Sequence, residues 1–363
     1  MKKIIQYLCL ALCAVMLLGV LASCKKKEPI PDADSETEQD VSADESQGEG
    51  TEDGDDTPSG DDGNPNPPDK DNDDDGGKPE YSTVETTVMT FNIRYQTDGD
   101  EGVKNWENRK AAVFEYINGQ DASIVCMQEV NPTQQADLRL NITERFDMIW
   151  YGRGGAGSEG LAIAYDKSTW SLLEQDCFWL SETPDVKSYG WGASKYRICV
   201  TALLEHNVTG AKMKVFNTHL DLSATPRVNG LKVIMSRIAQ CEYPVYLCGD
   251  FNDTPNSEAY AVAAETLQDA QITAPDSDEG STFTGWGTKT DADKYVIDFC
   301  FFSKESIEPL TYEICDDRWG ENNENMLSDH NAIKVKVKLR YKAEELPDIS
   351  GLIGSNGSDG VYS

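Results

Sequence analysis

Residues 245–252 read VYLCGDFN, and this stretch decides how the rest of the chain is interpreted. A short apolar run that ends in an acid and an amide predicts a buried strand whose end carries polar groups. In α/β architectures, ligands gather at the carboxyl ends of strands. Asp250 and Asn252 are therefore candidates for a functional site.

Two other segments have the same pattern. Residues 215–221 (VFNTHLD) lead from an apolar run into His219, and residues 328–335 (SDHNAIKV) place Asp329 and His330 before an apolar run. The chain has three histidines, and these are two of them. We expect the three segments to form one polar site built by distant parts of a sheet.

The wider pattern predicts the fold class. Strands are expected at residues 84–95, 122–130, 161–165, 171–179, 197–204, 212–218, 245–248, 296–302, 310–314 and 332–339, and helices at 106–118, from Pro132, at 227–239 and at 257–266. Antiparallel-looking runs lie in the middle, and strand–helix–strand units lie toward both ends. The expected fold is α/β (α+β), a four-layer sandwich in which two mixed β-sheets pack face to face with helices outside.

The first 23 residues have the pattern of a signal peptide. Two lysines precede the mostly apolar residues 4–20, and Leu-Ala-Ser then precedes Cys24. This ending resembles the lipobox of bacterial lipoproteins, which implies that residues 1–23 are removed and that Cys24 is lipidated. The alternative is a secretory peptide in which Cys24 is incidental. We expect an extracytoplasmic protein anchored to a bacterial membrane, the outer one, and facing the periplasm or the surface.

Composition divides the remaining chain into three parts. Residues 24–80 form an acidic linker, in which residues 28–80 hold 21 acidic residues against two lysines. Such a segment has too few apolar residues to offset its ordering entropy, so we expect a disordered, lipid-anchored spacer. Residues 81–342 have the length of one large α/β domain. Residues 343–363 are rich in Gly, Ser and Asp and are expected to form a flexible tail.

Charge and cysteine content limit the partners. The net charge is −32, and residues 81–363 contribute −18. Proteins that grip long nucleic acids usually present a basic face, so stable nucleic-acid binding is not expected. Seven of the ten cysteines lie beyond residue 80 without CxxC spacing, which argues against zinc or a disulfide framework. Nothing in the sequence indicates an oligomeric state.

Six short segments carry a family resemblance. In chain order they are 90–94 (TFNIR), 128–130 (QEV), 217–221 (NTHLD), 249–252 (GDFN), 297–299 (IDF) and 328–330 (SDH). Together they resemble the endonuclease/exonuclease/phosphatase (DNase I-like) superfamily over residues 86–340. Residues 178–184 (FWLSETP) and 282–285 (TFTG) are similar to a bacterial secreted branch. The resemblance implies a metal-dependent phosphoester hydrolase.

Phosphoester hydrolysis needs a cation, a positioned water and donors for the developing charge. Glu129 leaves a hydrophobic strand, where an unpaired carboxylate is costly, so a role as ligand of Mg²⁺ or Mn²⁺ is expected. The alternative is a solvated acid at a strand end. Asn92 would bind that metal or a phosphate oxygen, and Asp329 would lie near the metal.

The other polar strand-end residues have candidate catalytic roles. His330 is a candidate general base because imidazole titrates near neutral pH, and Asp298 would orient it. Asp250 would align the water or protonate the leaving group, and Asn252, expected on the same side of an extended segment, would donate to a phosphate oxygen. His219 would stabilise the five-coordinate phosphorus. The roles of Asp250 and His330 as base can be exchanged.

Two arginines complete the candidate set. Arg197 would clamp a phosphate, since guanidinium makes bidentate contacts; the alternative is a surface arginine on a strand. Arg94 stands where abasic-site nucleases of the superfamily carry an acid. With arginine at this position, a second carboxylate beside the metal is in doubt. The arginine adds a positive group that could instead bind a phosphate.

The expected function is a metal-dependent phosphoester hydrolase, a phosphodiesterase or phosphatase, acting outside the cytoplasm. Its substrate would be a small, lipid or glycan phosphoester. One alternative is a secreted nuclease that degrades DNA or RNA. Another, of a different class, is a catalytically silent surface binding module.

Overall fold

The computed structural model describes residues 81–342. The predicted signal peptide (1–23), linker (24–80) and flexible tail (343–363) lie outside the described residues. Within residues 81–342, no helix is both long and apolar enough to cross a membrane. The seven cysteines of this part of the chain are all unpaired.

The strands and helices alternate along the chain. The strands are β1 (Tyr81–Asn92), β2 (Ile124–Val130), β3 (Phe146–Gly152), β4 (Gly160–Asp166), β5 (Trp170–Trp179), β6 (Ile198–His206), β7 (Lys212–His219), β8 (Val245–Asp250), β9 (Leu267–Asp269), β10 (Asp276–Ser277), β11 (Asp298–Ser303), β12 (Ile307–Cys315), β13 (Arg318–Trp319), β14 (Asn325–Met326) and β15 (Ala332–Lys342). The α-helices are α2 (Trp106–Gly119), α3 (Pro132–Asn141), α4 (Ala224–Ile238), α5 (Glu258–Ala264) and α6 (Ala270–Thr273), with 3₁₀ turns η1 (Gly102–Lys104) and η2 (Asp291–Asp293).

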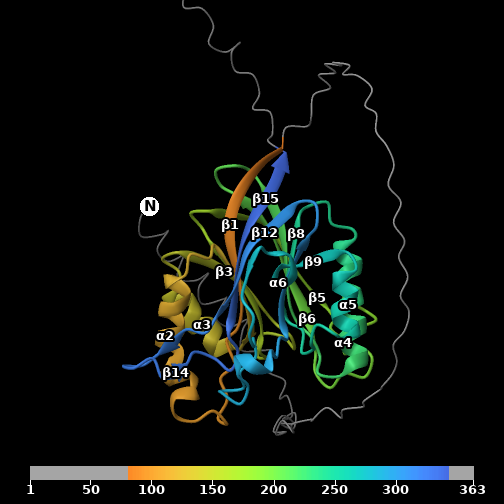
Figure 1. Ribbon diagram of the computed structural model, residues 1–363. Coiled ribbons are helices and arrows are strands. Elements are labelled where there is room, and N and C mark those ends of the chain that lie inside the picture. The colour runs from red at the N-terminus through yellow and green to blue at the C-terminus, as the bar shows by residue number, and fades with distance from the viewer. Residues whose placement is uncertain (1–80, 343–363) are drawn as a thin grey trace, which may run out of the picture. The chain divides into compact units, whose positions relative to one another are not determined.

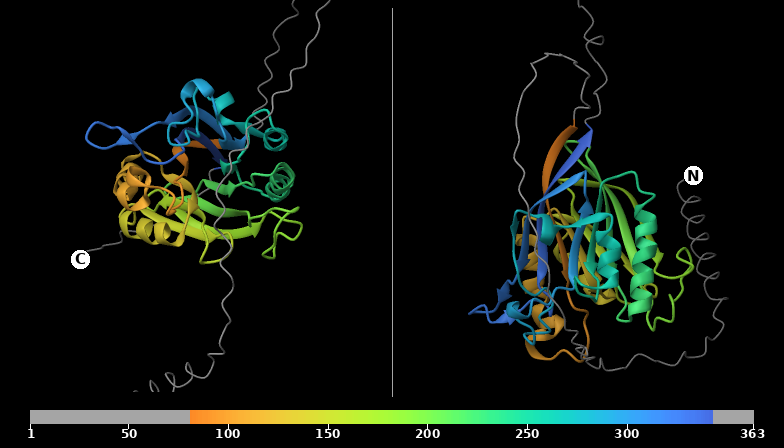
Figure 2. Two further views of the ribbon diagram at one scale, coloured as in Figure 1. Left: turned by 90° about the horizontal axis from the view of Figure 1, so that it is seen from below. Right: turned by 45° about the vertical axis from the view of Figure 1, so that its right-hand side comes forward.

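Two mixed sheets form the centre of the molecule (Figure 1). The first has seven strands in the order β10-β12-β15-β1-β2-β4-β3, and the second has six in the order β5-β6-β7-β8-β11-β9. Helices α2 and α3 cover the outer face of the first sheet, and α4 and α5 cover that of the second (Figure 2). The predicted four-layer sandwich is confirmed.

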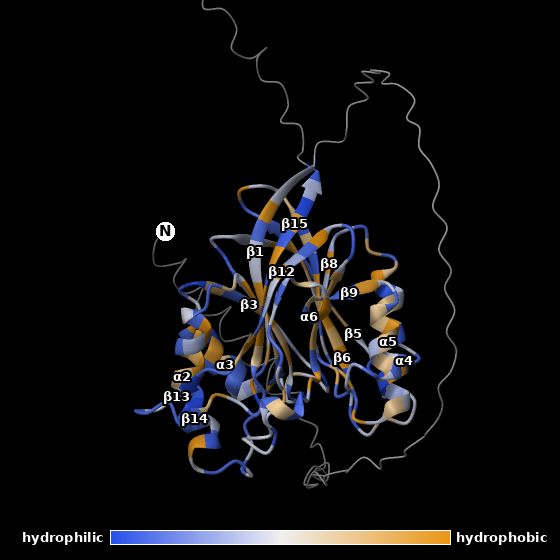
Figure 3. Ribbon diagram, viewed as in Figure 1, coloured by the Kyte–Doolittle hydropathy of each residue, from blue (hydrophilic) through white to orange (hydrophobic). Residues whose placement is uncertain are grey.

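Three apolar layers hold these elements together: one between the sheets, one beneath α2 and α3, and one beneath α4 and α5. Between the sheets, Val88 of β1 packs in one cluster with Val200 of β6. The next residue of β1, Met89, points to the opposite face and belongs to the cluster beneath α2 and α3. A strand buried on both faces reads as a continuous apolar run, and hydrophobic positions follow the central strands (Figure 3).

A polar bridge crosses the layer between the sheets. Asn217 of β7 is fully buried and donates to the carbonyls of Met127 (3.1 Å) and Ala162 (2.9 Å) in the opposite sheet. Its own carbonyl oxygen accepts a hydrogen bond from Gln128 at 2.8 Å. Buried polar groups of this kind are stable only when paired, so the bridge fixes how the sheets face each other.

Strand direction brings the polar strand ends to one edge of the sandwich. Strand β1 runs parallel to β2, and β7 runs parallel to β8, so the carboxyl ends of each pair lie together. Strands β15 and β11 run antiparallel to β1 and β8, and they therefore begin where those strands end. In this register Asp298 lies opposite Asp250.

Strand β3 was not among the expected elements. It lies at the end of the first sheet and pairs only with β4 among the described strands. Four consecutive hydrophobic residues, 148–151, hide the alternation that marks a half-buried strand. Its position is decided by pairing with β4 rather than by local pattern.

Candidate active site

Asn92, the last residue of β1, lies at the centre of the strand-end site. It is 1% exposed, and its Nδ2 is 3.2 Å from Glu129 Oε1, 3.0 Å from Asp250 Oδ2 and 3.4 Å from His330 Nε2. One amide therefore joins residues from β1, β2, β8 and the segment before β15. The structure brings these four sequence-predicted residues into direct contact.

Glu129 reaches the site through an irregularity in its strand. The pairing of β2 with β4 shifts between Met127 and Val130, and Glu129 has a φ of 63°, in the left-handed region. Non-glycine residues in this region are uncommon and concentrate at functional sites. The shift turns the carboxylate toward the backbone N–H of Tyr95, which donates to Oε2 at 2.9 Å.

The surroundings of Glu129 keep it ionised. Burial opposes the charged carboxylate, but the Arg94 guanidinium and the Tyr95 N–H outweigh that effect and hold the pKa of Glu129 below its ordinary value. Glu129 is therefore a carboxylate at neutral pH. This form is the one that can bind a cation.

His330 and Asp298 form a buried pair. His330 Nδ1 lies 2.9 Å from Asp298 Oδ2. Thr282 Oγ1 accepts the backbone N–H of Asp298 at 3.1 Å, and the Phe283 ring meets the imidazole edge-on with 5.0 Å between centroids. Residues 282–285, noted in the sequence as TFTG, therefore contact both members of the pair and hold them in position.

The charge around His330 favours its protonated form. Burial lowers the pKa of the imidazole, but Asp298, Asp250 and Asp329 together raise it to about 10. Burial and the nearby Asp298 also raise the pKa of the Asp250 carboxyl, but only to about 7. Of the two candidate bases, these pKa values favour Asp250 as the proton acceptor and His330 as the group that keeps its proton.

His219 adds a neutral imidazole at the end of β7. Its Nε2 lies 3.6 Å from Asp250 Oδ2. Burial lowers its pKa well below the ordinary value, and the positive charges of Arg197 and Arg153 add to this. His219 can therefore act as a hydrogen-bonding group without carrying charge.

Asn252 differs from the expected geometry. Strand β8 ends at Asp250, and Asn252 has a φ of 51°, so the segment is not extended there and the same-side argument is wrong. The backbone N–H of Asn252 donates to Asp250 Oδ1 at 2.8 Å, and its Nδ2 donates to the carbonyl of Leu220 at 3.0 Å. In this arrangement Asn252 holds the Asp250 carboxylate in place.

Arg94 also differs from expectation. Its Nε lies 3.2 Å from Asp100 Oδ2, and its Nη1 lies 3.7 Å from Asp329 Oδ2. The guanidinium is thus engaged with two acids rather than aimed at a phosphate position. Its charge offsets part of the negative charge that Glu129 and Asp329 bring to the site.

The donor chemistry of the site fits a hard divalent cation. Glu129 and Asp329 offer carboxylate oxygens, which Mg²⁺ and Mn²⁺ prefer. Asn92, also expected as a metal ligand, instead turns its Nδ2 toward Glu129, and its Oδ1 accepts the N–H of Arg94 at 3.0 Å. Burial raises the pKa of Asp329, and the charge of Glu129 adds to this against the opposing effect of His330. Such crowding of carboxylates is relieved by a bound cation.

A second group in the same site could also be considered for a cation. Asp250, Asp298 and His330 place one ligand atom each within 4.8 Å of one another. However, Asp298 Oδ2 and His330 Nδ1 are already bonded to each other at 2.9 Å, and a histidine nitrogen suits Mg²⁺ poorly. The Glu129 side of the site is the better match for Mg²⁺ or Mn²⁺.

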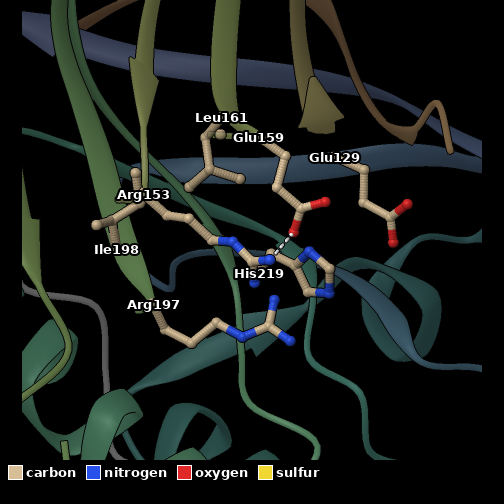
Figure 4. Close-up of a pocket in the computed structure, with 8 residues that line it drawn as sticks. Glu129, Arg153, Glu159, Leu161, Arg197, Ile198 and His219 are labelled. Atoms are coloured by element: carbon tan, nitrogen blue, oxygen red, sulfur yellow. Dashed lines mark ion pairs between the residues drawn. The ribbon is translucent and has the colours of Figure 1, made fainter. Parts of the chain in front are cut away.

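Arg197 lies in a pocket next to these residues (Figure 4). It is 6% exposed, so it is not the surface arginine of the alternative interpretation. The pocket is narrow and partly open to solvent, and it is lined by Glu129, Arg153, Glu159, Gly160, Leu161, Arg197, Ile198 and His219. Arg153 and Glu159 were missed in the sequence, where the glycine-rich loop at 152–160 was the available signal.

Arg109 of α2 was also missed. It is fully buried and donates from Nη1 to the carbonyls of Ile93 at 2.8 Å and Leu327 at 2.9 Å. These bonds tie the segment after β1 to the segment before His330. The available signal was an arginine among apolar residues of an amphipathic helix.

Comparison with known proteins identifies the family of this chain. Residues 89–330 match the model of the Endonuclease/Exonuclease/phosphatase family. A solved endonuclease/exonuclease/phosphatase from Bacteroides vulgatus is 31% identical with a TM-score of 0.66, over 70% of this chain and 99% of that one. A mannosyl-6-phosphatase from Bacteroides thetaiotaomicron VPI-5482 is 26% identical with a TM-score of 0.63, over 69% and 99%.

The chain covers only part of the first curated relatives. The CCR4-Not complex 3'-5'-exoribonuclease subunit Ccr4 from Aspergillus niger is 24% identical over 215 residues, covering 45% of this chain and 32% of that protein. The first curated relatives are matched over 32% to 60% of their own length. The fold, the family match and the site geometry agree: the chain belongs to the Endonuclease/Exonuclease/phosphatase family of phosphoester hydrolases.

Proposed function

We propose that this protein is a divalent-metal-dependent phosphoester hydrolase that acts outside the cytoplasm on a small, lipid or glycan phosphoester. The observation that carries the proposal is the contact of Asn92 with Glu129, Asp250 and His330; the four residues come from four separate segments. A cluster of buried titratable groups with displaced pKa values at strand ends is typical of a catalytic site.

Glu129 and Asp329 would hold the Mg²⁺ or Mn²⁺, and Asn92 would orient the Glu129 carboxylate through its Nδ2. When bound, such a cation polarises phosphoryl oxygens and stabilises developing negative charge. The residues around it have separate tasks. Asp250, held by the Asn252 N–H, accepts a proton from the attacking water.

His330, fixed by Asp298, remains protonated and donates from Nε2 to a phosphoryl oxygen as charge builds up. His219 adds a neutral N–H donor on the other side of Asp250. Asn252 has one amide hydrogen left for a phosphate oxygen after its bond to Leu220. Arg197 contributes a buried positive charge from the adjoining pocket.

A nuclease is the second candidate function. The similarity to an exoribonuclease subunit favours it. The net charge of −18 over residues 81–363 argues against gripping long nucleic acids. Degradation of RNA by the purified protein at low salt would support the nuclease, and its absence would favour the small substrate. Metal binding without hydrolysis of any phosphoester would instead favour the binding module.

The first test uses the full chain, purified in detergent and stripped with chelator. Mg²⁺ or Mn²⁺ is added, and release from a chromogenic phosphodiester and a monoester is followed for the wild type and His330→Ala. We expect metal-dependent turnover that falls by roughly 10²–10⁴-fold in the variant. Full turnover by His330→Ala would contradict the proposal.

Metal binding is measured separately from activity. For Glu129→Gln we expect Mn²⁺ affinity in calorimetry to fall at least about tenfold, since a neutral amide replaces a charged oxygen ligand. The exposed Glu144→Gln serves as the matched control. Unchanged Mn²⁺ affinity in Glu129→Gln would remove this residue from the metal site.

A further inference from the structure

The pocket beside the catalytic residues contains two arginines with unused donors. Arg197 Nε and Arg153 Nη1 are buried, and neither has a hydrogen-bond partner among the described residues. Buried polar groups are paired in the large majority of cases. Two orphaned guanidinium N–H groups in one pocket therefore indicate a ligand that accepts hydrogen bonds.

The acidic residues near these arginines do not accept hydrogen bonds from the two unpaired N–H groups. Arg153 pairs through Nη2 with Glu159 Oε1 at 2.8 Å, which leaves Nη1 unused. Arg197 Nε lies 3.8 Å from Asp221 Oδ2, beyond hydrogen-bond distance. Each guanidinium has five donors in a fixed fork that matches the oxygens of carboxylate or phosphate.

The pocket is continuous with the catalytic site. Glu129 and His219 line it, and His219 Nε2 lies 3.6 Å from Asp250 Oδ2. Figure 4 shows the side chains of Arg153 and Arg197 reaching toward His219 from different directions. A group held by the two arginines would thus adjoin both His219 and the Glu129 carboxylate of the metal side.

The size and walls of the pocket limit what it accepts. The pocket is narrow, with room for about one water molecule between its side chains. Leu161 and Ile198 close part of the wall with apolar atoms. The space admits an atom of the size of a phosphate oxygen and is too small for a second ester substituent.

We propose that Arg153 and Arg197 bind the unesterified oxygens of a terminal phosphate, so that this protein prefers phosphomonoesters to phosphodiesters. The inference rests on the proposed hydrolase function and narrows its substrate class. A monoester presents three unesterified oxygens and nearly two negative charges near neutral pH. A diester presents two such oxygens and one charge, and its second substituent would occupy the space between the arginines.

The test compares p-nitrophenyl phosphate with bis(p-nitrophenyl) phosphate on the full chain. We expect the wild type to favour the monoester at least about tenfold in kcat/KM. Arg153→Gln and Arg197→Gln should each lose at least about tenfold more kcat/KM on the monoester than on the diester. Arg139→Gln, an exposed arginine on α3, is the matched control and should change neither.

Equal losses on the two substrates, or a wild type that favours the diester, would overturn the inference while leaving the hydrolase intact. Absence of metal-dependent turnover by the wild type on either substrate would instead count against the hydrolase.

Orthophosphate binding in calorimetry tests the arginines without turnover. The wild type should bind orthophosphate more tightly than dimethyl phosphate, and Arg197→Gln should lose that preference; equal binding by the wild type would also overturn the inference.

A folding defect is separated from a binding defect by Arg197→Lys. This variant keeps the positive charge without the bidentate fork, so its monoester kcat/KM should lie between those of the wild type and Arg197→Gln. Thermal unfolding of each variant shows whether the fold is retained. A lysine variant as impaired as the glutamine variant, with unchanged melting, would contradict a role for charge at this position.

Discussion

At the scale of single residues, catalysis is expected to depend on how Asp298 holds His330. For Asp298→Asn we expect kcat to fall by roughly 10²–10⁴-fold with a much smaller change in KM, because the amide no longer stabilises the imidazolium. Steady-state kinetics on the monoester measure this. Near-wild-type kcat would show that the pair is only structural.

Asp269 provides a residue-scale prediction about stability. Burial raises the pKa of this carboxyl from 3.8 to about 6, although the Gln271 N–H and the Tyr260 hydroxyl favour the ionised form. Between these values the folded state binds more protons than the unfolded state. The free energy of unfolding therefore decreases as pH rises through this window, by about 2–3 kcal/mol in total.

The variant Asp269→Asn does not titrate, so it should lack this contribution. We expect its stability relative to the wild type to increase by about 2–3 kcal/mol between pH 4 and pH 7. Urea unfolding of both proteins at the two pH values measures the difference, and comparison of the two proteins cancels the other titrating groups. A constant difference across this range would refute the assignment.

At the scale of elements, the contact between β7 and the opposite sheet is expected to control stability. For Asn217→Ala we expect the free energy of unfolding to fall by about 2–4 kcal/mol, because Gln128 and the carbonyls of Met127 and Ala162 lose their buried partner. Denaturant unfolding tests this. The exposed Asn322→Ala should change stability by less than about 0.5 kcal/mol.

Element ends also explain where the site lies. The parallel pairs β1–β2 and β7–β8 end at the same edge, where the antiparallel strands β11 and β15 begin. This arrangement collects side chains far apart in sequence; Asn92 and His330 are separated by 238 positions. Rigid strands hold these groups more accurately than loops would.

At the scale of the whole molecule, we propose that a lipid anchor at Cys24 holds the hydrolase at a membrane. We expect the full chain, expressed in a bacterium that processes lipoproteins, to be found in the membrane fraction. Cys24→Ala should prevent lipidation and move the protein out of that fraction, while kcat/KM on a soluble monoester stays unchanged. Fractionation with immunoblotting measures this. An unchanged distribution would contradict an anchor at Cys24.

Much of the fold was predictable because local pattern expresses it. Continuous apolar runs predicted buried strands, and the two-sheet sandwich with outer helices is confirmed. Strand β3 was missed because residues 148–151 do not alternate. The end of β8 was also misjudged, since the left-handed φ of Asn252 follows from its bonds to Asp250 and Leu220, which local pattern does not reveal.

The sequence by itself determined the chemistry available to this protein: polar residues at the ends of apolar strands, an acidic overall charge and the order of the family's segments. Only the tertiary structure decided how these groups act on one another. Contacts between distant segments bury Arg197 and place it in one pocket with Arg153. Such contacts also raise the pKa of Asp250 and lower that of His219. The physical reason is that desolvation and charge interactions depend on distance in space, which register and sheet packing set.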